Sequence, residues 1–406
     1  MKPRMKHLRH PVRTAAAARN LLALYLNIKI RGDRSHRHYR GDARYDLTNV
    51  SNGFLSRLDD SSEDAEVLER ICAAYIRAAQ QEAFAPEVYQ ASGWWRQVRL
   101  ASLGPVMQAL SSRDVISLRQ MYRNFFRDAS STGLIGVPYS LTKAYFDGQI
   151  KDIHRRFFLG DALYGIDYWK TLTGDCIPLS ALAGPKIGNP FGIMIGGTLV
   201  RSGAVYQHYS AYKIARCLLS AKATVAEFGG GFGGMAYYLL RDQPEVKYID
   251  FDVPESLALA SYYLLRSFPH LKFLLYGEGA ITAETLASAD VVLMPLFEME
   301  SLPNGSIELV FSSHAMSDIS QEAMTAYLNT ISRISIGRFL YMGNAQGAEL
   351  ISKLAAEAQP LFCVDEIRPS GWNTHRFPSA DEVECLFTPV AVRKSATECS
   401  PSEPRG

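Results

Sequence analysis

The sequence predicts an α/β protein in which an α-helical region precedes a largely parallel, doubly wound sheet. Three observations support this fold class. From residue 224 onward, short apolar runs alternate with segments of helical periodicity. Between residues 46 and about 175, apolar residues recur mainly at helical spacing, beginning with a helix near Ser61. A turn that contains five glycines joins the first predicted strand to the next helix.

The 406 residues, 47% of them hydrophobic, are enough for a large unit and a smaller one. Gly and Pro interrupt short apolar runs between residues 176 and 202, which predicts a loop with a small hairpin. We divide the chain into a basic, partly disordered arm (1–45), a mainly helical acceptor or cap domain (46–203), a sheet domain (204–392) and a disordered tail (393–406).

Each predicted element follows from apolar periodicity and from its flanking Ser, Gly or Pro residues. Before the sheet, further helices are expected over 96–110, 114–127 and 141–158. In the sheet domain, the expected helices are 204–219, 233–241, 256–267 and 321–334, and the expected strands are 224–228, 246–251, 289–294, 307–312 and 338–342.

A net charge of +2 hides a strong asymmetry, because residues 1–45 carry +10 and the remainder carries −8. With its amphipathic segment 15–30, the arm can make weak contact with an anionic membrane surface, but a solvated extension is the simpler interpretation. The arm lacks the aromatic and basic interleaving of nucleic-acid sites, so we expect no nucleic-acid partner. No apolar run approaches membrane-span length, and the six scattered cysteines follow no secretory signal, which favours a soluble, cytoplasmic protein.

The glycine-rich turn Glu227-Phe228-Gly229-Gly230-Gly231-Phe232-Gly233-Gly234 stands where backbone approaches a ligand closely. It fits two templates, Glu-x-Gly-x-Gly-x-Gly for S-adenosylmethionine and Gly-x-Gly-x-x-Gly for a dinucleotide. Charge favours the first, because Glu227 would repel a pyrophosphate and attract a sulfonium and an ammonium group. We therefore predict S-adenosylmethionine as the cofactor, bound at Glu227, Phe228, Gly229, Gly230, Gly231 and Gly233.

Further cofactor contacts are expected at the ends of the next strands. Asp250 and Asp252 both lie near the spacing of a ribose-binding carboxylate, and we favour Asp252 because it ends its strand. Met294 and Pro295 end the third strand, where an adenine ring should lie, and Ser312 ends the fourth.

Three segments, 225–234, 252–257 and 311–319, resemble the sugar O-methyltransferase family of class I S-adenosylmethionine-dependent methyltransferases. Similarity also extends upstream, so that it covers roughly residues 60–345. The resemblance implies a Rossmann-like class I methyltransferase domain and methyl transfer to a sugar hydroxyl of a glycan, a nucleotide sugar or a glycosylated natural product. The family's fourth motif maps onto Asp318-Ile319, and this chain departs from it by placing His314 inside the preceding run.

Methyl transfer to a hydroxyl needs alignment and a base. His314 follows the fourth strand, at the sheet edge where ligands bind, so it is the leading base. Asp318 is its orienting partner or an alternative base, His208 is a candidate for the acceptor pocket, and His375 is a weaker one. The sequence shows no metal-ligand motif, and we predict no metal.

Three other functions compete with this prediction. The acceptor can be a small molecule other than a sugar, or the turn can hold NAD in an oxidoreductase. A non-catalytic module that binds membranes through the basic arm is the third.

Overall fold

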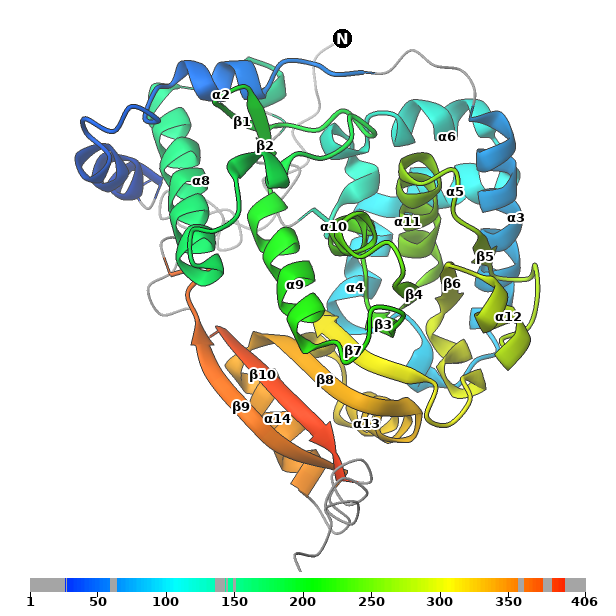
Figure 1. Ribbon diagram of the computed structural model, residues 1–406. Helices are drawn as coiled ribbons and strands as arrows, with labels where there is room; N and C mark the ends of the chain where they lie inside the picture. Colours follow the sequence, from blue (N-terminus) through cyan, green and yellow to red (C-terminus); the bar gives the residue numbers. More distant parts are fainter. Residues whose placement is uncertain are drawn as a thin grey trace, which may run out of the picture.

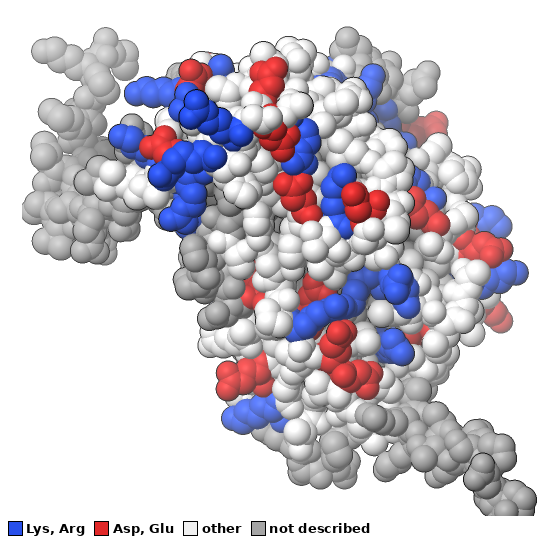
Figure 2. Space-filling view, turned by 60° about the vertical axis from the view of Figure 1, so that its left-hand side comes forward, with Lys and Arg blue, Asp and Glu red and all other residues white. Residues whose placement is uncertain are grey.

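The computed structural model describes residues 26, 28–58, 64–135, 143, 145–148, 151–356, 361–374 and 382–390. The predictions for residues 1–25 and for the tail 393–406 lie outside these residues. None of the described helices combines the length and the apolar character that crossing a bilayer requires. Basic side chains gather at one corner of the face in Figure 2, and the described part of the basic arm exposes Lys29, Arg34, Arg37 and Arg40.

An eight-stranded sheet in the order β5-β6-β4-β3-β7-β8-β10-β9 forms the centre of the molecule (Figure 1). Neighbouring strands from β5 to β8 are parallel, whereas β10 pairs antiparallel with both β8 and β9. The chain runs outward from β3 to one side and then returns to place β7 on the other, which creates a crevice at the carboxyl ends of β3 and β7. The strands are β3 (Thr224–Phe228), β4 (Lys247–Asp252), β5 (Phe273–Leu275), β6 (Val291–Pro295), β7 (Ile307–Ser313), β8 (Ser335–Asn344), β9 (Phe362–Ser370) and β10 (Glu382–Pro389).

Helices cover both faces of this sheet (Figure 1). Successive residues of a strand point to opposite faces, so Val225 of β3 packs with α9–α11 and Ala226 packs with α13 and α14. These helices are α9 (Ala204–Cys217), α10 (Gly234–Asp242), α11 (Pro254–Ser267), α13 (Gln321–Ile334) and α14 (Ala345–Ala356), with the short α12 (Ala283–Ser288) at one edge. The predicted fold class is confirmed as to architecture: a Rossmann-like, largely parallel sheet with helices on both faces follows an α-helical region.

The helical region packs on the α9–α11 side, where α3 lies against α11 and α8 lies against α9. The predicted hairpin between residues 176 and 202 is present as β1 and β2. The division into domains at residue 203 stays a prediction. The elements are α2 (Thr48–Gly53), α3 (Ala65–Glu82), α4 (Gly93–Val98), a π-helical turn η2 (Arg99–Leu103), α5 (Gly104–Ser112), α6 (Val115–Tyr122), α8 (Asp152–Thr173), β1 (Gly192–Ile195) and β2 (Thr198–Arg201).

Several elements were predicted only in part or were missed. The predicted helix 141–158 is confirmed in its last part, where residues 152–158 form the start of α8, which continues through Gly160 and Gly165; residues 141, 142, 144, 149 and 150 of that prediction lie outside the described residues. These glycines serve close packing, because a Cβ on Gly160 would stand 2.2 Å from the Ser35 Cβ. The strands β5, β9 and β10 and the helix α14 were not predicted. The outer strand β9 mixes charged and apolar residues on a half-exposed surface, so its sequence lacks the apolar run of a central strand.

Glu255, at the start of α11, fastens the helical region to the sheet domain. Its side chain is 2% exposed and accepts hydrogen bonds from Trp95 Nε1 (2.5 Å) and from Arg99 Nε and Nη2 (2.5 and 2.8 Å). Arg99 also binds Glu82 at the end of α3, with 2.9 Å between Nη2 and Oε1. A buried carboxylate with three charge-assisted or indole donors therefore fixes α4 and η2 over α11.

We expect Glu255→Ala to lower the free energy of unfolding by roughly 2–4 kcal/mol, because it leaves a mostly buried guanidinium with one carboxylate instead of two. Urea denaturation followed by circular dichroism measures this change. The matched control Glu245→Ala removes an exposed carboxylate and should change stability by less than about 0.5 kcal/mol. Equal losses in the two variants would contradict the role given to Glu255.

Candidate active site

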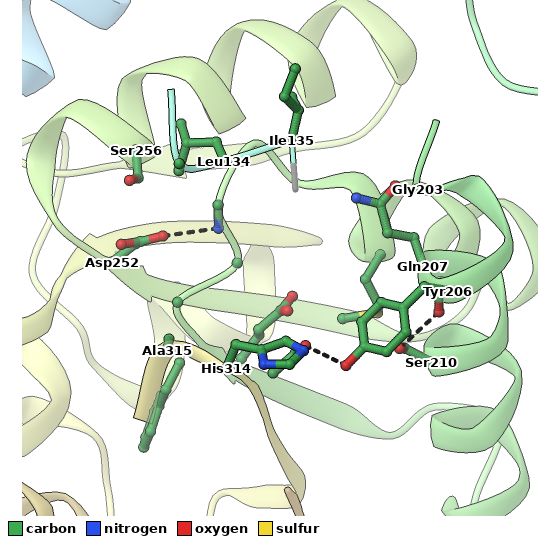
Figure 3. Close-up of a pocket in the computed structure, with 18 of the residues that line it drawn as sticks. Leu134, Ile135, Gly203, Tyr206, Gln207, Ser210, Asp252, Ser256, His314 and Ala315 are labelled. Carbon is green, nitrogen blue, oxygen red and sulfur yellow. Dashed lines mark hydrogen bonds between the residues drawn. The ribbon is translucent and has the colours of Figure 1, made fainter. Parts of the chain in front are cut away.

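A cavity of about 620 Å³ opens at the carboxyl ends of β3, β4 and β7. Its wall is built from segments far apart in the sequence: the glycine turn after β3, the start of α9, the end of β7, and parts of the helical region. Figure 3 shows Asp252 and Ser256 on one side of the glycine turn and Gly203, Tyr206 and Gln207 on the other. The cavity thus has two halves that meet at the turn.

Close approach explains the glycines of the turn. Gly229 and Gly231 have φ values of +84° and +64°, which favour glycine. A Cβ on Gly230 would lie 2.7 Å from the carboxylate of Asp250, and one on Gly229 would lie 2.1 Å from the Cβ of Ala315. The N–H of Gly230 donates to Asp250 Oδ1 (3.0 Å), and the N–H of Gly231 donates to Asp252 Oδ2 (2.9 Å). The turn is therefore held by two carboxyl groups of the last three residues of β4.

Three buried carboxyl groups surround this turn. Burial raises the pKa of Glu227 to about 8. The hydrogen bond that Tyr248 donates to Glu227 Oε2 (2.5 Å) lowers this pKa, whereas the charge of Asp252 raises it further. Burial likewise raises the pKa of Asp252 to about 7, although the N–H groups of Gly231 and Val253 lower it. The pKa of Asp250 is raised well above its usual value by burial and by both neighbouring carboxyl groups. An added positive charge would relieve this accumulation of acidic groups.

The cavity reaches some of the predicted cofactor residues and not others. Glu227, Phe228, Gly229, Gly230, Gly231 and Asp252 line it, whereas Asp250 lies beneath the turn. Gly233 is the N-cap of α10, and its N–H donates to Gly230 O (3.0 Å).

Three residues that we predicted to contact the cofactor do not line the cavity: Met294, Pro295 and Ser312. Met294 is 1% exposed and packs in the core, because it points to the α13 side of the sheet. Leu296, which follows Pro295, lines the cavity in place of Met294 and Pro295. Ser312 is buried, and its Oγ donates to Phe228 O at 2.9 Å. The helical region supplies wall residues that the sequence did not single out, among them Gln90, Ala91 and Leu134.

On the α9 side, aromatic rings form the wall. Tyr206 shares a hydrogen bond of 2.7 Å with Ser313 Oγ, and its ring centroid lies 5.5 Å from that of Trp372 in an edge-to-face contact. Phe158 and Asp161 of α8 complete this half. Trp372 and Asn373 belong to the segment after β9, so the C-terminal hairpin contributes to the cavity.

His314 stands at the end of β7 with φ +60°, an uncommon conformation for a residue with a side chain. Its backbone N–H donates to Met342 O (3.0 Å), and its carbonyl accepts from the N–H of Ser317 (2.8 Å), which holds this conformation. The side chain is 48% exposed and lines the cavity, with its ring 5.9 Å from that of Tyr206 (Figure 3).

The carboxylate nearest to His314 in the described residues is that of Glu382, with 3.9 Å between Nε2 and Oε1. Glu382 begins β10 and also accepts a hydrogen bond from Asn373 Nδ2 (2.5 Å). Asp318, the predicted partner, ends the short helix η7 (Ala315–Asp318), and its side chain lies outside what the structure describes. Glu382 was missed because no local sequence signal joins it to His314.

His208 does not line the cavity, so the prediction that it shapes the acceptor pocket is wrong. Two residues along a helix point in nearly opposite directions, and Tyr206 occupies the cavity side of α9. His208 is 4% exposed, accepts a hydrogen bond from Trp169 Nε1 at Nδ1 (3.1 Å) and lies 3.8 Å from Asp242. Burial lowers its pKa to about 4, which keeps it neutral at pH 7. His375 lies outside the described residues.

Comparisons with known proteins agree with the fold and go no further. No protein-family model matches the sequence, and no match is found among curated proteins. A TehB-like S-adenosylmethionine-dependent methyltransferase from Corynebacterium glutamicum is 13% identical, with 56% of this chain and 98% of that chain covered and a TM-score of 0.31.

Two further solved structures are similar over a shorter part of the chain. A predicted O-methyltransferase from Agrobacterium tumefaciens is 14% identical over 44% of this chain and 80% of that chain, with a TM-score of 0.30. Geranyl diphosphate methyltransferase, solved with geranyl diphosphate and sinefungin, is 9% identical over 46% and 80%, with a TM-score of 0.33. Because these TM-scores are low, the fold assignment rests on the strand order of the sheet and not on the similarity to these structures.

We expect Glu227→Gln to stabilise the ligand-free protein at alkaline pH. The carboxyl group holds its proton up to about pH 8 in the folded protein and only to about 4.5 in the unfolded chain, so its contribution to stability falls as pH rises between these values. Replacement by Gln should therefore add roughly 1–3 kcal/mol at pH 9 and little at pH 4. Urea denaturation at both pH values measures this difference. The exposed control Glu349→Gln should show no such pH dependence, and a Glu227→Gln gain that is equal at both pH values would contradict the assignment.

Proposed function

We propose that the protein is an S-adenosylmethionine-dependent methyltransferase that acts on a sugar hydroxyl. The observation that carries the cofactor assignment is the acidic glycine turn, in which Glu227 and Asp252 line the cavity and Asp250 lies beneath. A sulfonium and an ammonium group would compensate these carboxylates. The residues present thus fit a cationic nucleoside.

The same turn disfavours a dinucleotide. A pyrophosphate would need free backbone N–H groups at the turn and the start of the following helix. Here the N–H groups of Gly230 and Gly231 already donate to Asp250 and Asp252. A pyrophosphate would also approach three buried carboxyl groups, which is unfavourable in a medium of low dielectric constant.

The two halves of the cavity suit a donor and an acceptor. Asp252 ends β4 beside the turn, where its carboxylate would accept hydrogen bonds from a ribose diol. Leu296 would contact the adenine ring, since it follows the next strand of the sheet. The reactive end of the donor would then face Tyr206 and His314 on the far side of the turn (Figure 3).

When bound, S-adenosylmethionine supplies a methyl group for in-line transfer to the acceptor oxygen. His314 would accept the proton of the attacking hydroxyl at Nε2 or Nδ1, and the exposed side of the imidazole would release it to solvent. Glu382 would orient the imidazole and stabilise its protonated form. The rings of Tyr206 and Trp372 would contact a sugar ring, and Asp161 and Asn373 offer hydrogen-bond partners for its hydroxyl groups.

The sugar assignment rests on the resemblance of the motifs and on this mixture of aromatic and polar wall residues. A planar aromatic acceptor is the second candidate, because the same rings would stack on it. Mass spectrometry of the methylated product after a screen of glycosides, nucleotide sugars and phenols separates the two.

We expect calorimetric titration to show micromolar binding of S-adenosylmethionine and no binding of NAD. Asp252→Ala should weaken binding about 10- to 100-fold, the usual range for a lost hydrogen bond to a charged group. Affinity should rise with pH through about 7–8, because a cationic ligand favours the ionised forms of Asp252 and Glu227. The exposed control Glu245→Ala should bind like the wild type. Binding of NAD alone, or of neither compound, would refute the proposal.

We expect His314→Asn to reduce kcat by about 10²- to 10⁴-fold with donor affinity unchanged. Asn tolerates the left-handed backbone of this position and does not act as a base at neutral pH. Glu382→Gln should reduce kcat by roughly 10-fold, in the range of other residues that orient a functional side chain. In the His314→Asn background it should have no further effect. Glu366→Gln on the adjacent strand β9 is the matched control, and additive losses in the double variant would contradict the pairing.

A further inference from the structure

The described wall of the cavity contains one buried guanidinium, that of Arg201, at the end of β2. Arg201 is 4% exposed, and its ring contacts bury it further, with Cζ 5.0 Å from the centroid of Phe126 and 5.1 Å from that of Phe232. Phe232 belongs to the glycine turn. The guanidinium therefore lies beside the turn, on the wall formed by β2 and α9.

The hydrogen-bond partners that the structure describes for Arg201 carry no charge. Nη1 donates to the carbonyl oxygen of Ser202 at 2.9 Å, and Nη2 donates to Oε1 of Gln207. Nε is buried and has no partner among the described residues. Burying a positive charge without an anion is costly, so the arrangement favours a ligand that brings one.

A second, independent feature at the same place also favours an anion. The helix α9 begins at Ala204, three residues after Arg201. Its N-cap Gly203 has φ +82° and provides no side-chain cap. The first turn of α9 contains no acidic residue. Its backbone N–H groups and the positive end of the helix dipole therefore lie at the cavity, which Gly203, Val205 and Tyr206 line.

Position then distinguishes the two ends of the proposed donor. Asp252 and the α9 terminus lie on opposite sides of the glycine turn (Figure 3). With the ribose at Asp252, the amino-acid end of S-adenosylmethionine would extend across the turn toward Gly203 and Gln207. That end carries one ammonium and one carboxylate, and the wall offers a carboxyl group at Glu227 and a guanidinium at Arg201.

We propose that Arg201 and the uncapped N-terminus of α9 bind the carboxylate of the donor's methionine moiety. This inference rests on the proposed function, because it assigns one part of the donor to one wall of that cavity. It makes β2, within the predicted cap domain, part of the cofactor site. It also explains why a guanidinium is buried beside a turn that is otherwise acidic.

The test compares S-adenosylmethionine with decarboxylated S-adenosylmethionine, which keeps the sulfonium and the ammonium group and lacks only the carboxylate. Calorimetric titration of the wild type should show the decarboxylated compound binding at least about 10-fold more weakly, as expected for loss of a charge-assisted hydrogen bond. In Arg201→Met, which keeps an apolar stem between Phe126 and Phe232, the ratio of the two affinities should fall toward one. Arg201→Lys should keep part of the discrimination.

The control is Arg216→Met, which removes an exposed guanidinium that stacks on Tyr212 at the other end of α9. It should leave both affinities unchanged. Equal affinity of the wild type for both compounds would overturn the inference while leaving the proposed function standing. So would an Arg201→Met variant that weakens both compounds equally, the result expected if Arg201 only holds the turn in place. Binding of neither compound by the wild type would overturn the proposed function and this inference together.

Discussion

The site depends on the contact between the glycine turn and two carboxyl groups near the end of β4. Two backbone N–H groups, those of Gly230 and Gly231, are directed at Asp250 and Asp252, and no side chain larger than hydrogen fits at Gly230. The same contact joins β3 to β4 at the sheet edge where ligands bind. It also buries three acidic side chains at the cavity floor, where burial raises the pKa of each carboxyl group, so that their ionisation costs stability as pH rises. The proposed selectivity for a cationic ligand and the expected loss of stability at alkaline pH therefore have one physical origin.

Around this floor, the walls come from regions that the sheet alone does not provide. Glu255 holds α4 and η2 over α11, which places Trp95 at one side of the cavity. The antiparallel hairpin of β9 and β10 brings Trp372, Asn373 and Glu382 to the other side, close to His314. Between them, β2 and α9 add the guanidinium of Arg201 and an uncapped helix terminus. The electrostatic pattern is therefore acidic beside Asp252 and mixed on the far side of the turn, which suits the proposed ligand with a positive and a negative group.

The local sequence predicted the site best where one short segment has both an unusual backbone and chemically distinctive residues. A Gly-rich turn after an apolar strand and before an apolar helix limits the possible folds, and the acidic residue before it limits the ligand. Where the pattern indicated only that a strand is buried, it did not predict which of its residues face the cavity. Met294 and Ser312 are the penultimate residues of strands beside the cavity, yet the pleat directs their side chains away from it, since a one-residue shift changes the face. His208 was placed by type and neighbourhood, and the helical rotation between it and Tyr206 decided against it.

The amino-acid pattern alone predicts the alternation of strands and helices, the position of the glycine turn and the acidic residues beside it. These features depend on residues within one strand–turn–helix unit or on the strand that follows it, where spacing along the chain sets spacing in space. Three features appear only once the chain is folded: Glu382 lies beside His314, Arg201 lines the cavity without an acidic partner in the described residues, and His208 is a buried, neutral core residue. Each of these depends on how elements from distant parts of the chain pack, and packing leaves no local pattern because many side chains can fill the same buried volume.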